Sequence, residues 1–470
     1  MYRFDNVIGA ELGQKAEVII LGGGLAGLSA AVRLLDNGYR VNIIESRSFL
    51  GGRSFSFKDK ETGLEMDNGQ HVITKVCSMY LDLAERLGIL NGWKIQDDFH
   101  LQVYDKFNKV GTLKSSWLPA PFHLAASFFN YGHLNFREKM GICTALYRAK
   151  RTNRDSQEFE RLLFVEWLVR NKQTPRSIEF FWNLIVMPIL NDRVEHVSTR
   201  MALMAIQEGL LKSKHNADIG YPVQNLSSMM GKSVARYFAN HDSCLTLSTP
   251  VTALKIMDGQ VKTVVLKGGI ELESEIVISA IPVAALLKIL PRTALSIPYF
   301  SRLGGLQNSP IVNIHFWYDR KVMDNEFCVF VDSALQWVFN KNDNDPELYS
   351  NLNEVGVDCP DDISQHICIS LSAAWEYIDQ SKEDLIGKFM KEMLLSFPKA
   401  RQANVVRAFV IKQRNATFRC LPGSGDIRPT GQTPYDNLFL AGDWTDTGWP
   451  STMESAVRSG YNAAQAIITK

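Results

Sequence analysis

Three glycines near the N-terminus have the spacing of a dinucleotide-binding turn. Gly22, Gly24 and Gly27 form the pattern GxGxxG directly after the apolar run at 17–21. In such a turn the first glycine permits a sharp bend, the second lets the backbone approach a pyrophosphate, and the third lets the next helix pack closely. Glu45 follows 21 residues after Gly24, where a carboxylate accepts hydrogen bonds from a ribose diol and disfavours a 2′-phosphate.

A second glycine pair follows this acidic residue within one short loop. Gly51 and Gly52 allow another close approach of the backbone, and Arg53 can neutralise a phosphate or lie near a flavin. The alternative for Arg53 is an ion pair at the surface. A β-α-β unit followed by this glycine–glycine–arginine element resembles the large flavoprotein family of amine oxidases and phytoene-type desaturases. The resemblance implies that the dinucleotide is FAD.

The C-terminal part of the chain carries a second motif for the same cofactor. An apolar run at 438–440 leads into Gly442 and Asp443. In the resembling family such a pair places the acid near the ribityl chain and pyrophosphate of FAD. Ser451 and Glu454 have the spacing of a capping box, which predicts a helix that begins there. Its positive end would stabilise negative charge on a reduced flavin; a capped surface helix without a ligand is the alternative.

The string Asp67-Asn68-Gly69-Gln70-His71 indicates one branch of this family. Together with FFWNLIVMPILN at 180–191 and GDWTDTGWPSTMESAVRSG at 442–460, it resembles the squalene-associated FAD-dependent desaturases, also called hydroxysqualene dehydroxylases. The resemblance covers residues 16–470. It implies a reductive removal of a hydroxyl group, in which hydroxysqualene loses water and gains a hydride to give squalene.

Three polar residues of this string are our candidate catalytic groups: Asp67, Gln70 and His71. An alcohol is a poor leaving group, so an acid must protonate it or hydrogen-bond to it. The carbocation that forms needs a dry pocket and a nearby hydride. For each of the three residues, a purely structural role is the alternative to catalysis. Asp67 can order its own loop through backbone N–H groups, Gln70 can brace the cofactor, and His71 can be a satisfied structural histidine.

The motifs and the resemblance together predict which residues contact FAD. The predicted contacts are Gly22, Gly24, Leu25, Ala26, Gly27, Glu45, Ser46, Gly51, Gly52, Arg53, Gly69, Gln70, Val251, Gly442, Asp443, Thr452 and Met453. The sequence predicts no metal site, because its histidines and cysteines show no ligand spacing.

The elements that position these motifs are those of an α/β fold. Apolar runs at 17–21 and 41–44 flank a helical pattern at 25–35, so the chain begins with a β-α-β unit of a parallel sheet. Residues 245–280 alternate and contain turn signals, which predicts a β-meander. The apolar stretch 177–191 predicts a helix broken at Pro188, which either fills the core or lines a pocket for a greasy ligand.

The two cofactor motifs lie at opposite ends of the sequence, so the parts between them must be inserted. We predict a mixed α/β fold in which a Rossmann-like FAD-binding domain is interleaved with a substrate domain, as in amine oxidases and phytoene desaturases. The cofactor domain is expected at 1–110, 225–300 and 400–470. The substrate domain is expected at 111–224 and 301–399, with a helical part that can contact a membrane.

The segment 115–136 contains no Asp, Glu, Lys or Arg, yet carries Trp117, Phe122, Phe128 and Phe129. It is too broken by proline and glycine to span a bilayer. It predicts either a buried helical hairpin or an interfacial patch that dips into lipid. The second reading gives the protein a peripheral contact with a membrane.

Composition limits the remaining classes of partner. The 470 residues carry a formal charge of +1, with 46% hydrophobic and 21% charged residues. This balance is that of a globular chain and gives no sign of a nucleic-acid partner. Seven cysteines without CxxC spacing predict a reducing compartment. With no signal peptide or spanning segment, we expect a cytoplasmic protein, which the interfacial patch would place peripherally on the inner face of the membrane.

The predicted substrate is a polyisoprenoid, and the electron donor is unidentified because no second GxGxxG or cysteine cluster is present. Three other functions remain as alternatives. A carotenoid or phytoene-type desaturase would oxidise its substrate with the same fold and cofactor. A flavin amine oxidase would act on amines, and a flavin-bearing scaffold for isoprenoid assembly would have no enzymatic activity.

Overall fold

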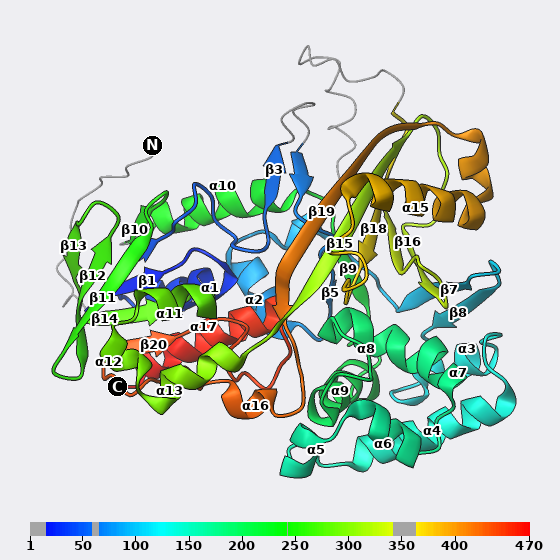
Figure 1. Cartoon of the computed structure of the whole chain (residues 1–470), viewed down its shortest axis with the longest axis horizontal. Helices are drawn as coiled ribbons and strands as arrows, with labels where there is room; N and C mark the ends of the chain where they lie inside the picture. Colours follow the sequence, from blue (N-terminus) through cyan, green and yellow to red (C-terminus); the bar gives the residue numbers. More distant parts are fainter. Residues whose placement is uncertain (1–15, 59–64, 242, 342–362) are drawn as a thin grey trace.

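The computed structural model describes residues 16–58, 65–241, 243–341 and 363–470. Within these ranges, five parallel strands form one sheet in the order β10-β2-β1-β14-β20 (Figure 1). Their bounds are β1 Glu17–Leu21, β2 Arg40–Ile44, β10 Ser243–Thr246, β14 Ile276–Ser279 and β20 Leu438–Leu440. Strand β14 lies between β1 and β20. The N-terminal and C-terminal motifs therefore follow strands of one sheet, whose carboxyl ends are the usual ligand edge.

Alternate side chains of β1 point to opposite faces of the sheet and pack into two different hydrophobic cores. Val18 and Ile20 pack with four helices, whereas Ile19 and Leu21 pack with a small antiparallel sheet. The helices are α1 Leu25–Leu35, α2 Ser78–Arg86, α10 Leu226–Ala239 and α17 Met453–Ile468. The antiparallel strands are β11 Val251–Met257, β12 Gln260–Leu266 and β13 Glu271–Glu273. Burial on both faces explains the continuous apolar strands.

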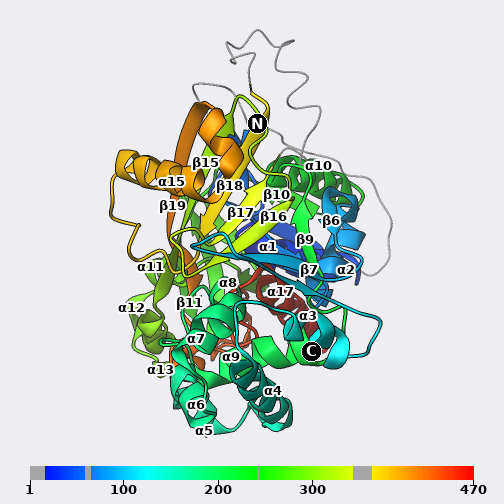
Figure 2. The ribbon, with the colours of Figure 1, turned by 90° about the vertical axis from the view of Figure 1, so that its right-hand side faces the viewer.

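A larger mixed sheet lies beside this layer (Figures 1 and 2). In the described part of the chain it has seven strands, in the order β19-β15-β18-β17-β16-β7-β8. Their bounds are β7 His100–Asp105, β8 Val110–Lys114, β15 Asn308–Tyr318, β16 Phe327–Val331, β17 Trp337–Asn340, β18 Gln365–Leu371 and β19 Val405–Phe418. One face of the sheet packs on α15, Lys382–Ser396.

Short elements complete the cofactor side and the large sheet. Strand β3 Ser56–Lys58 pairs with β4 Glu65–Asp67. Strand β9 Ile219–Pro222 pairs with β5 Ile73–Thr74 and β6 Trp93–Ile95. The short helices are η1 Leu90–Gly92, α11 Val283–Ile289, α12 Arg292–Leu295, α13 Pro298–Ser301, η5 Arg302–Gly305, η7 Pro398–Gln402 and α16 Ser424–Ile427.

A helical region follows the β7–β8 hairpin. Its elements are η2 Phe122–Leu124, α3 Ala125–Phe129, α4 Phe136–Arg151, α5 Gln157–Arg161, α6 Phe164–Arg170, α7 Pro175–Ser177, η3 Ile178–Trp182, α8 Asn183–Leu190, α9 Thr199–Ile206 and η4 Gln207–Leu211. Segment 115–136 forms no helical hairpin, so that alternative is wrong. Up to residue 135 only η2 and α3 are helical, and the side chains of Trp117 and Phe122 are 86% and 62% exposed.

Two further sequence predictions need correction. Helix α8 continues through Pro188, which lies in its last turn and removes a single backbone N–H, and the helix ends at Leu190 before Asn191, which is in the left-handed conformation. Residues 245–280 are not one meander. Strand β14 is buried and pairs in parallel with β1, so only the part from β11 to β13 is an antiparallel meander.

The predicted α/β fold is confirmed. The division into a cofactor domain and a substrate domain stays a prediction; residues 1–15, 59–64, 242 and 342–362 of its ranges lie outside the described residues. The hairpin β7–β8 of the large sheet spans the boundary placed at 110. In the described part of the chain, no helix is both long and apolar enough to cross a bilayer.

Candidate functional site

The two glycine turns lie against each other and leave bare backbone between them. Gly22 has a φ of 103°, which a residue with a side chain rarely adopts. A Cβ on Gly27 would lie 1.9 Å from the Gly22 carbonyl oxygen, so only glycine lets α1 pack on this turn. The Gly51 N–H donates to the Gly23 carbonyl at 2.9 Å. A Cβ on Gly52 would lie 3.0 Å from Gly24 Cα.

The N-terminus of α1 fits the pyrophosphate of a dinucleotide. Gly24 precedes the helix and offers no side-chain cap, so the first N–H groups, those of Leu25, Ala26 and Gly27, have no side-chain acceptor at the cap. An anion at such an end is stabilised by these donors and by the helix dipole. The glycine-lined backbone and the uncapped helix end therefore have the donors and the space that a dinucleotide pyrophosphate requires.

Glu45 stands at the end of β2, beside the same turn. Its buried carboxylate accepts hydrogen bonds from the N–H groups of Gly23 at 2.7 Å and Arg47 at 2.8 Å, and from the Ser46 hydroxyl at 3.1 Å. A carboxylate has about four acceptor positions, so capacity for a ribose hydroxyl remains. Val251 begins β11, two residues after Thr249, whose N–H donates to the Glu45 carbonyl.

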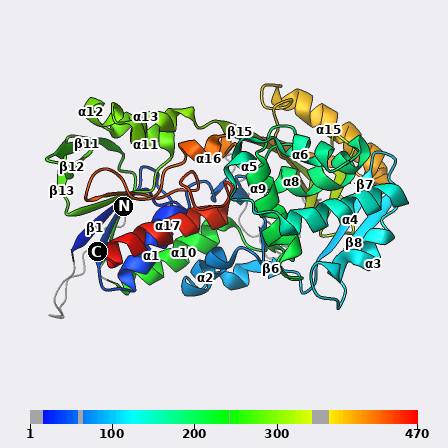
Figure 3. The same ribbon diagram turned by 90° about the horizontal axis from the view of Figure 1, so that it is seen from below.

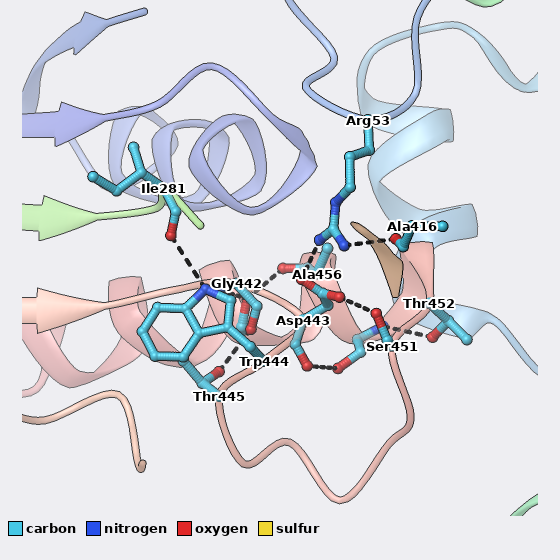
Figure 4. Close-up of polar contacts among 12 residues, drawn as sticks. Arg53, Ile281, Ala416, Gly442, Asp443, Trp444, Thr445, Ser451, Thr452 and Ala456 are labelled. Atoms are coloured by element: carbon cyan, nitrogen blue, oxygen red, sulfur yellow. Dashed lines mark hydrogen bonds and ion pairs between the residues drawn. The ribbon is translucent and has the colours of Figure 1, made fainter. Parts of the chain in front are cut away.

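Arg53 and Asp443 join the N-terminal and C-terminal motifs directly (Figure 4). The Arg53 guanidinium donates to one carboxylate oxygen of buried Asp443, and to the Ala416 carbonyl at 2.9 Å. The Ser451 hydroxyl donates to the other oxygen of Asp443. Arg53 is thus half-exposed and paired, as the surface ion-pair alternative supposed, but its partner is the cofactor-motif aspartate.

The capping box predicted at Ser451 and Glu454 is wrong by one residue. Thr452 caps α17 and accepts a hydrogen bond from the Ser455 N–H at 3.1 Å, so the helix begins at Met453. Ser451 is engaged with Asp443. Glu454 instead accepts from the N–H groups of Met79 and Tyr80 at the start of α2. Its carboxylate therefore caps a different helix.

Helix α17 reaches the site because it packs very closely on α1. A Cβ on Gly460 would lie 2.1 Å from the Ser29 hydroxyl oxygen and 2.2 Å from the Ala26 carbonyl oxygen. The Ser29 hydroxyl donates to the Val457 carbonyl at 3.3 Å. This crossing explains how the last helix of the chain comes to stand beside the first one.

Arg428 is a site residue that sequence reasoning missed. Its buried guanidinium donates to three backbone carbonyls: that of Asp443 at 3.3 Å, that of Thr445 at 2.5 Å and that of Trp449 at 2.8 Å. Burial lowers the pKa of this side chain. By holding three carbonyls, Arg428 fixes the loop between β20 and α17. No local pattern around Arg428 marks it as buried.

The loop at residues 67–71 lies between the glycine–glycine–arginine loop at 51–53 and the large sheet. The Asn68 amide donates to the Arg53 carbonyl at 2.7 Å. Asp67 is buried, and its carboxylate accepts from the Ser56 hydroxyl at 2.8 Å and the Leu226 N–H at 3.0 Å. These contacts are those of a residue that orders its loop. The acid role of Asp67 stays a prediction.

Lys341, also missed from the sequence, ties this loop to the end of β17. Its ammonium lies 3.0 Å from the Gln70 side-chain oxygen and 3.4 Å from an Asp67 carboxylate oxygen. His71 Nδ1 lies 3.0 Å from the Gly69 carbonyl. Burial lowers the pKa of His71, and the charge of Lys341 acts in the same direction, whereas Asp67 opposes it.

The facing surface of the large sheet is also polar. On β15 the even positions from Val312 to Tyr318 pack toward α15, while Asn313 and His315 lie on the other face. The Asn313 side-chain oxygen accepts from the Gln70 N–H at 3.4 Å. His315 Nδ1 lies 2.9 Å from His366 Nε2. This alternation of polar and apolar residues is a sequence signal that could have identified both side chains.

Burial lowers the pKa of His315 to about 3, with the charge of Lys341 as a smaller cause. Burial also lowers the pKa of His366. The structure thus joins the glycine turns, Arg53, Asp443 and the 67–71 loop into one region, faced by neutral histidines. Loops from both ends of the chain meet there.

Comparisons with known proteins agree with this arrangement. The family described as flavin containing amine oxidoreductase matches residues 25–468. The chain is 28% identical to 15-cis-phytoene desaturase of Synechococcus elongatus, over 96% of each protein. It is 25% identical to zeta-carotene desaturase of Synechocystis, over 96% of this chain and 97% of the relative.

Solved structures show the same fold. An oxidoreductase from Methanosarcina mazei superposes with a TM-score of 0.72 at 16% identity, over 97% of this chain and 100% of the other. Cyclohexylamine oxidase from Brevibacterium oxydans superposes with a TM-score of 0.70 at 15% identity, over 97% and 99%. The chain therefore belongs to the flavin-containing amine oxidoreductases, and its cofactor is FAD.

Proposed function

We propose that this FAD-dependent oxidoreductase acts on a polyisoprenoid hydrocarbon, as a phytoene-type desaturase. The main support for this proposal is the sequence match to 15-cis-phytoene desaturase of Synechococcus elongatus over 96% of both chains. This reading takes precedence over the hydroxysqualene reaction, because the curated relatives described above are carotene-pathway desaturases.

Aromatic side chains beside His315, here called the aromatic wall, support the proposal of an apolar substrate. Phe339, Cys368 and His315 lie in register across β17, β18 and β15. Trp337 stacks on Phe339 with ring centroids 5.9 Å apart, and Phe327 lies 5.9 Å from Phe339. Aromatic ring faces are large apolar surfaces and favour contact with an apolar chain.

Desaturation removes a hydride and a proton from adjacent carbons, and bound FAD supplies the hydride acceptor. The protein side must exclude water and hold the loop at 67–71 still. Three contacts hold the loop in place: Lys341 and the Leu226 N–H of α10 bind Asp67, and Asn313 of β15 accepts from the Gln70 N–H. The aromatic wall excludes water.

Reductive dehydroxylation of hydroxysqualene is the second candidate. It is favoured by the string at 67–71, which places Asp67, Gln70 and His71 in one loop, with Asp67 buried and the other two half-buried. In this direction the substrate would lose its hydroxyl, together with a proton, as water, and bound reduced FAD would supply the hydride for the new C–H bond. An external donor, still unidentified, would reduce the flavin.

We also propose a peripheral membrane contact through residues 115–136. Trp117, Phe122 and Phe129 are 86%, 62% and 43% exposed. Rings that stand out from the surface in this way are typical of side chains that enter the interfacial layer of a bilayer. Such a contact would give the enzyme access to a substrate dissolved in lipid.

One anaerobic experiment separates the two reactions. Oxidised, FAD-loaded protein is mixed with phytoene in detergent micelles, and photoreduced protein is mixed with hydroxysqualene. Desaturation predicts bleaching of the flavin and a product with an additional double bond. Dehydroxylation predicts reoxidation and squalene.

The control is Gly24→Val, whose side chain would occupy the narrow gap in front of Gly52 and exclude the pyrophosphate. If neither substrate changes the flavin, the isoprenoid proposal is refuted. Rapid bleaching by amines, with peroxide release in air, would instead identify an amine oxidase.

A further inference from the structure

The segment from Lys106 to Arg151 is strongly cationic in a chain that is almost neutral. It holds eight lysine and arginine residues and one acidic residue, Glu138, a formal charge of +7. The whole chain carries +1, so the rest carries −6. Glu138 is buried, and its carboxylate accepts from the Asn135 N–H at 2.9 Å and the Thr174 hydroxyl at 3.1 Å. Its charge is therefore directed inward.

The positive charges, in contrast, are on the surface. Seven of the eight basic residues are exposed: Lys106, Lys109, Lys114, Arg137, Arg148, Lys150 and Arg151. Lys139 is buried and donates to the Phe129 carbonyl at 2.7 Å. Lys114, Arg137 and Lys150 form no ion pair with any other residue that the structure describes. Their charge is therefore available to a partner.

Aromatic side chains are interleaved with these cations. Besides Trp117, Phe122 and Phe129, three more aromatic side chains stand out: Phe107 is 79% exposed, Phe136 69% and Tyr147 59%. Hydrogen bonds join the elements of this segment: the Lys114 N–H donates to the Ser127 hydroxyl at 2.9 Å, which links β8 to α3, and the Lys139 ammonium of α4 donates to the Phe129 carbonyl of α3. Figure 3 shows β7, β8, α3 and α4 together at the end of the molecule opposite β1 and the C-terminus.

We propose that the face formed by residues 106–151 docks on a bilayer that contains anionic lipids. Aromatic rings at the interface bury apolar surface, and lysine and arginine around them attract acidic headgroups. A second copy of this chain fits less well, because two such faces would bring like charges together. The inference builds on the proposed membrane contact and names the headgroup chemistry, but it does not depend on which isoprenoid is the substrate.

The test is flotation of the FAD-loaded protein with vesicles. We expect the protein to float with vesicles of phosphatidylcholine and phosphatidylglycerol at low salt, and to bind pure phosphatidylcholine vesicles much more weakly. High salt should release it, because the Debye length falls to about 3 Å at 1 M salt. Flotation needs no turnover, so failure of the proposed reaction in detergent micelles would leave this result unaffected.

A charge-neutralised variant measures the contribution of the cations. Lys114→Gln, Arg137→Gln and Lys150→Gln together should weaken the partition onto anionic vesicles on the order of 100-fold, since each charge contributes roughly fivefold. The matched control replaces three exposed lysines on the cofactor side, Lys232, Lys267 and Lys288, by glutamine. The control should float like the wild type, and both variants should keep the thermal midpoint and flavin absorbance of the wild type.

The aromatic contribution has its own pair of variants. Trp117→Ser with Phe122→Ser should reduce binding to anionic vesicles, whereas Met257→Ser with Ile270→Ser, two exposed apolar residues elsewhere, should not. Equal flotation with neutral and anionic vesicles, or unchanged flotation of the charge-neutralised variant, would overturn the proposal. So would a dimer in lipid-free solution that the Trp117 and Phe122 substitutions dissociate.

Discussion

Replacing Lys341 by methionine tests whether this side chain holds the 67–71 loop. The Lys341 and Asp67 side chains are 9% and 3% exposed, and their charged atoms lie 3.4 Å apart. At an effective dielectric constant of about 20, two such charges attract by about 5 kcal/mol. Both groups lost their hydration on burial, so the pair contributes less than this. Removing one partner leaves the other charge buried and typically costs about 3–5 kcal/mol.

We therefore expect Lys341→Met to lower the free energy of unfolding, measured by urea denaturation of the FAD-loaded protein, by about 3–5 kcal/mol. Asp67→Asn combined with Lys341→Met should be less destabilised than the sum of the single variants, because the residues are in contact. The control is Lys255→Met, which breaks an exposed ion pair with Glu271 and should cost less than about 1 kcal/mol. If Lys341→Met costs no more than Lys255→Met, the buried ion pair does not stabilise the loop.

Three further predictions address the packing, the C-terminal loop and the pH dependence. Gly460→Ala should destabilise the protein by about 1–3 kcal/mol, because its Cβ meets the backbone of α1. Gly231→Ala, in open space on α10, should be neutral or stabilising by up to about 1 kcal/mol; equal effects in thermal denaturation would contradict the close crossing. Arg428→Met should release three carbonyls and weaken FAD retention during gel filtration by at least about tenfold, since hydrogen bonds to charged groups contribute about 1.5–3 kcal/mol each; full retention would show that the loop is held otherwise. The pKa values of His315 and His366 are lowered by folding, so the unfolded chain binds more protons and stability falls as pH drops below about 6.5, by up to about 1.4 kcal/mol per pH unit for each histidine. Urea denaturation between pH 7 and 5 should show this slope, and it should be flatter in the His315→Asn/His366→Asn variant.

The sequence by itself determined the cofactor turn and its setting. Gly22 and Gly27 are required by local geometry, namely a positive φ and a helix packed onto the turn. Such constraints act within a few residues, so spacing alone reveals them. The apolar strand EVIIL and the helix after it follow from short-range periodicity in the same way.

The capping of α17 shows where local patterns fail. Ser451 and Glu454 have the right spacing, but Asp443 binds the serine hydroxyl and the start of α2 binds the glutamate. Ser451 and Glu454 could together cap one helix, but each binds a different group that comes close only when the chain folds. Thr452, which no capping box marked, caps the helix instead.

Only the tertiary structure decided which side chains surround the motifs. Arg53 meets Asp443, and Lys341 meets Asp67, across 390 and 274 positions of sequence. The charge of an arginine or lysine is visible in any sequence, but burial and partners depend on how distant strands pair. A buried charge is stable only where the whole fold supplies its counter-charge and hydrogen bonds, and that condition is not written in any local stretch of the chain.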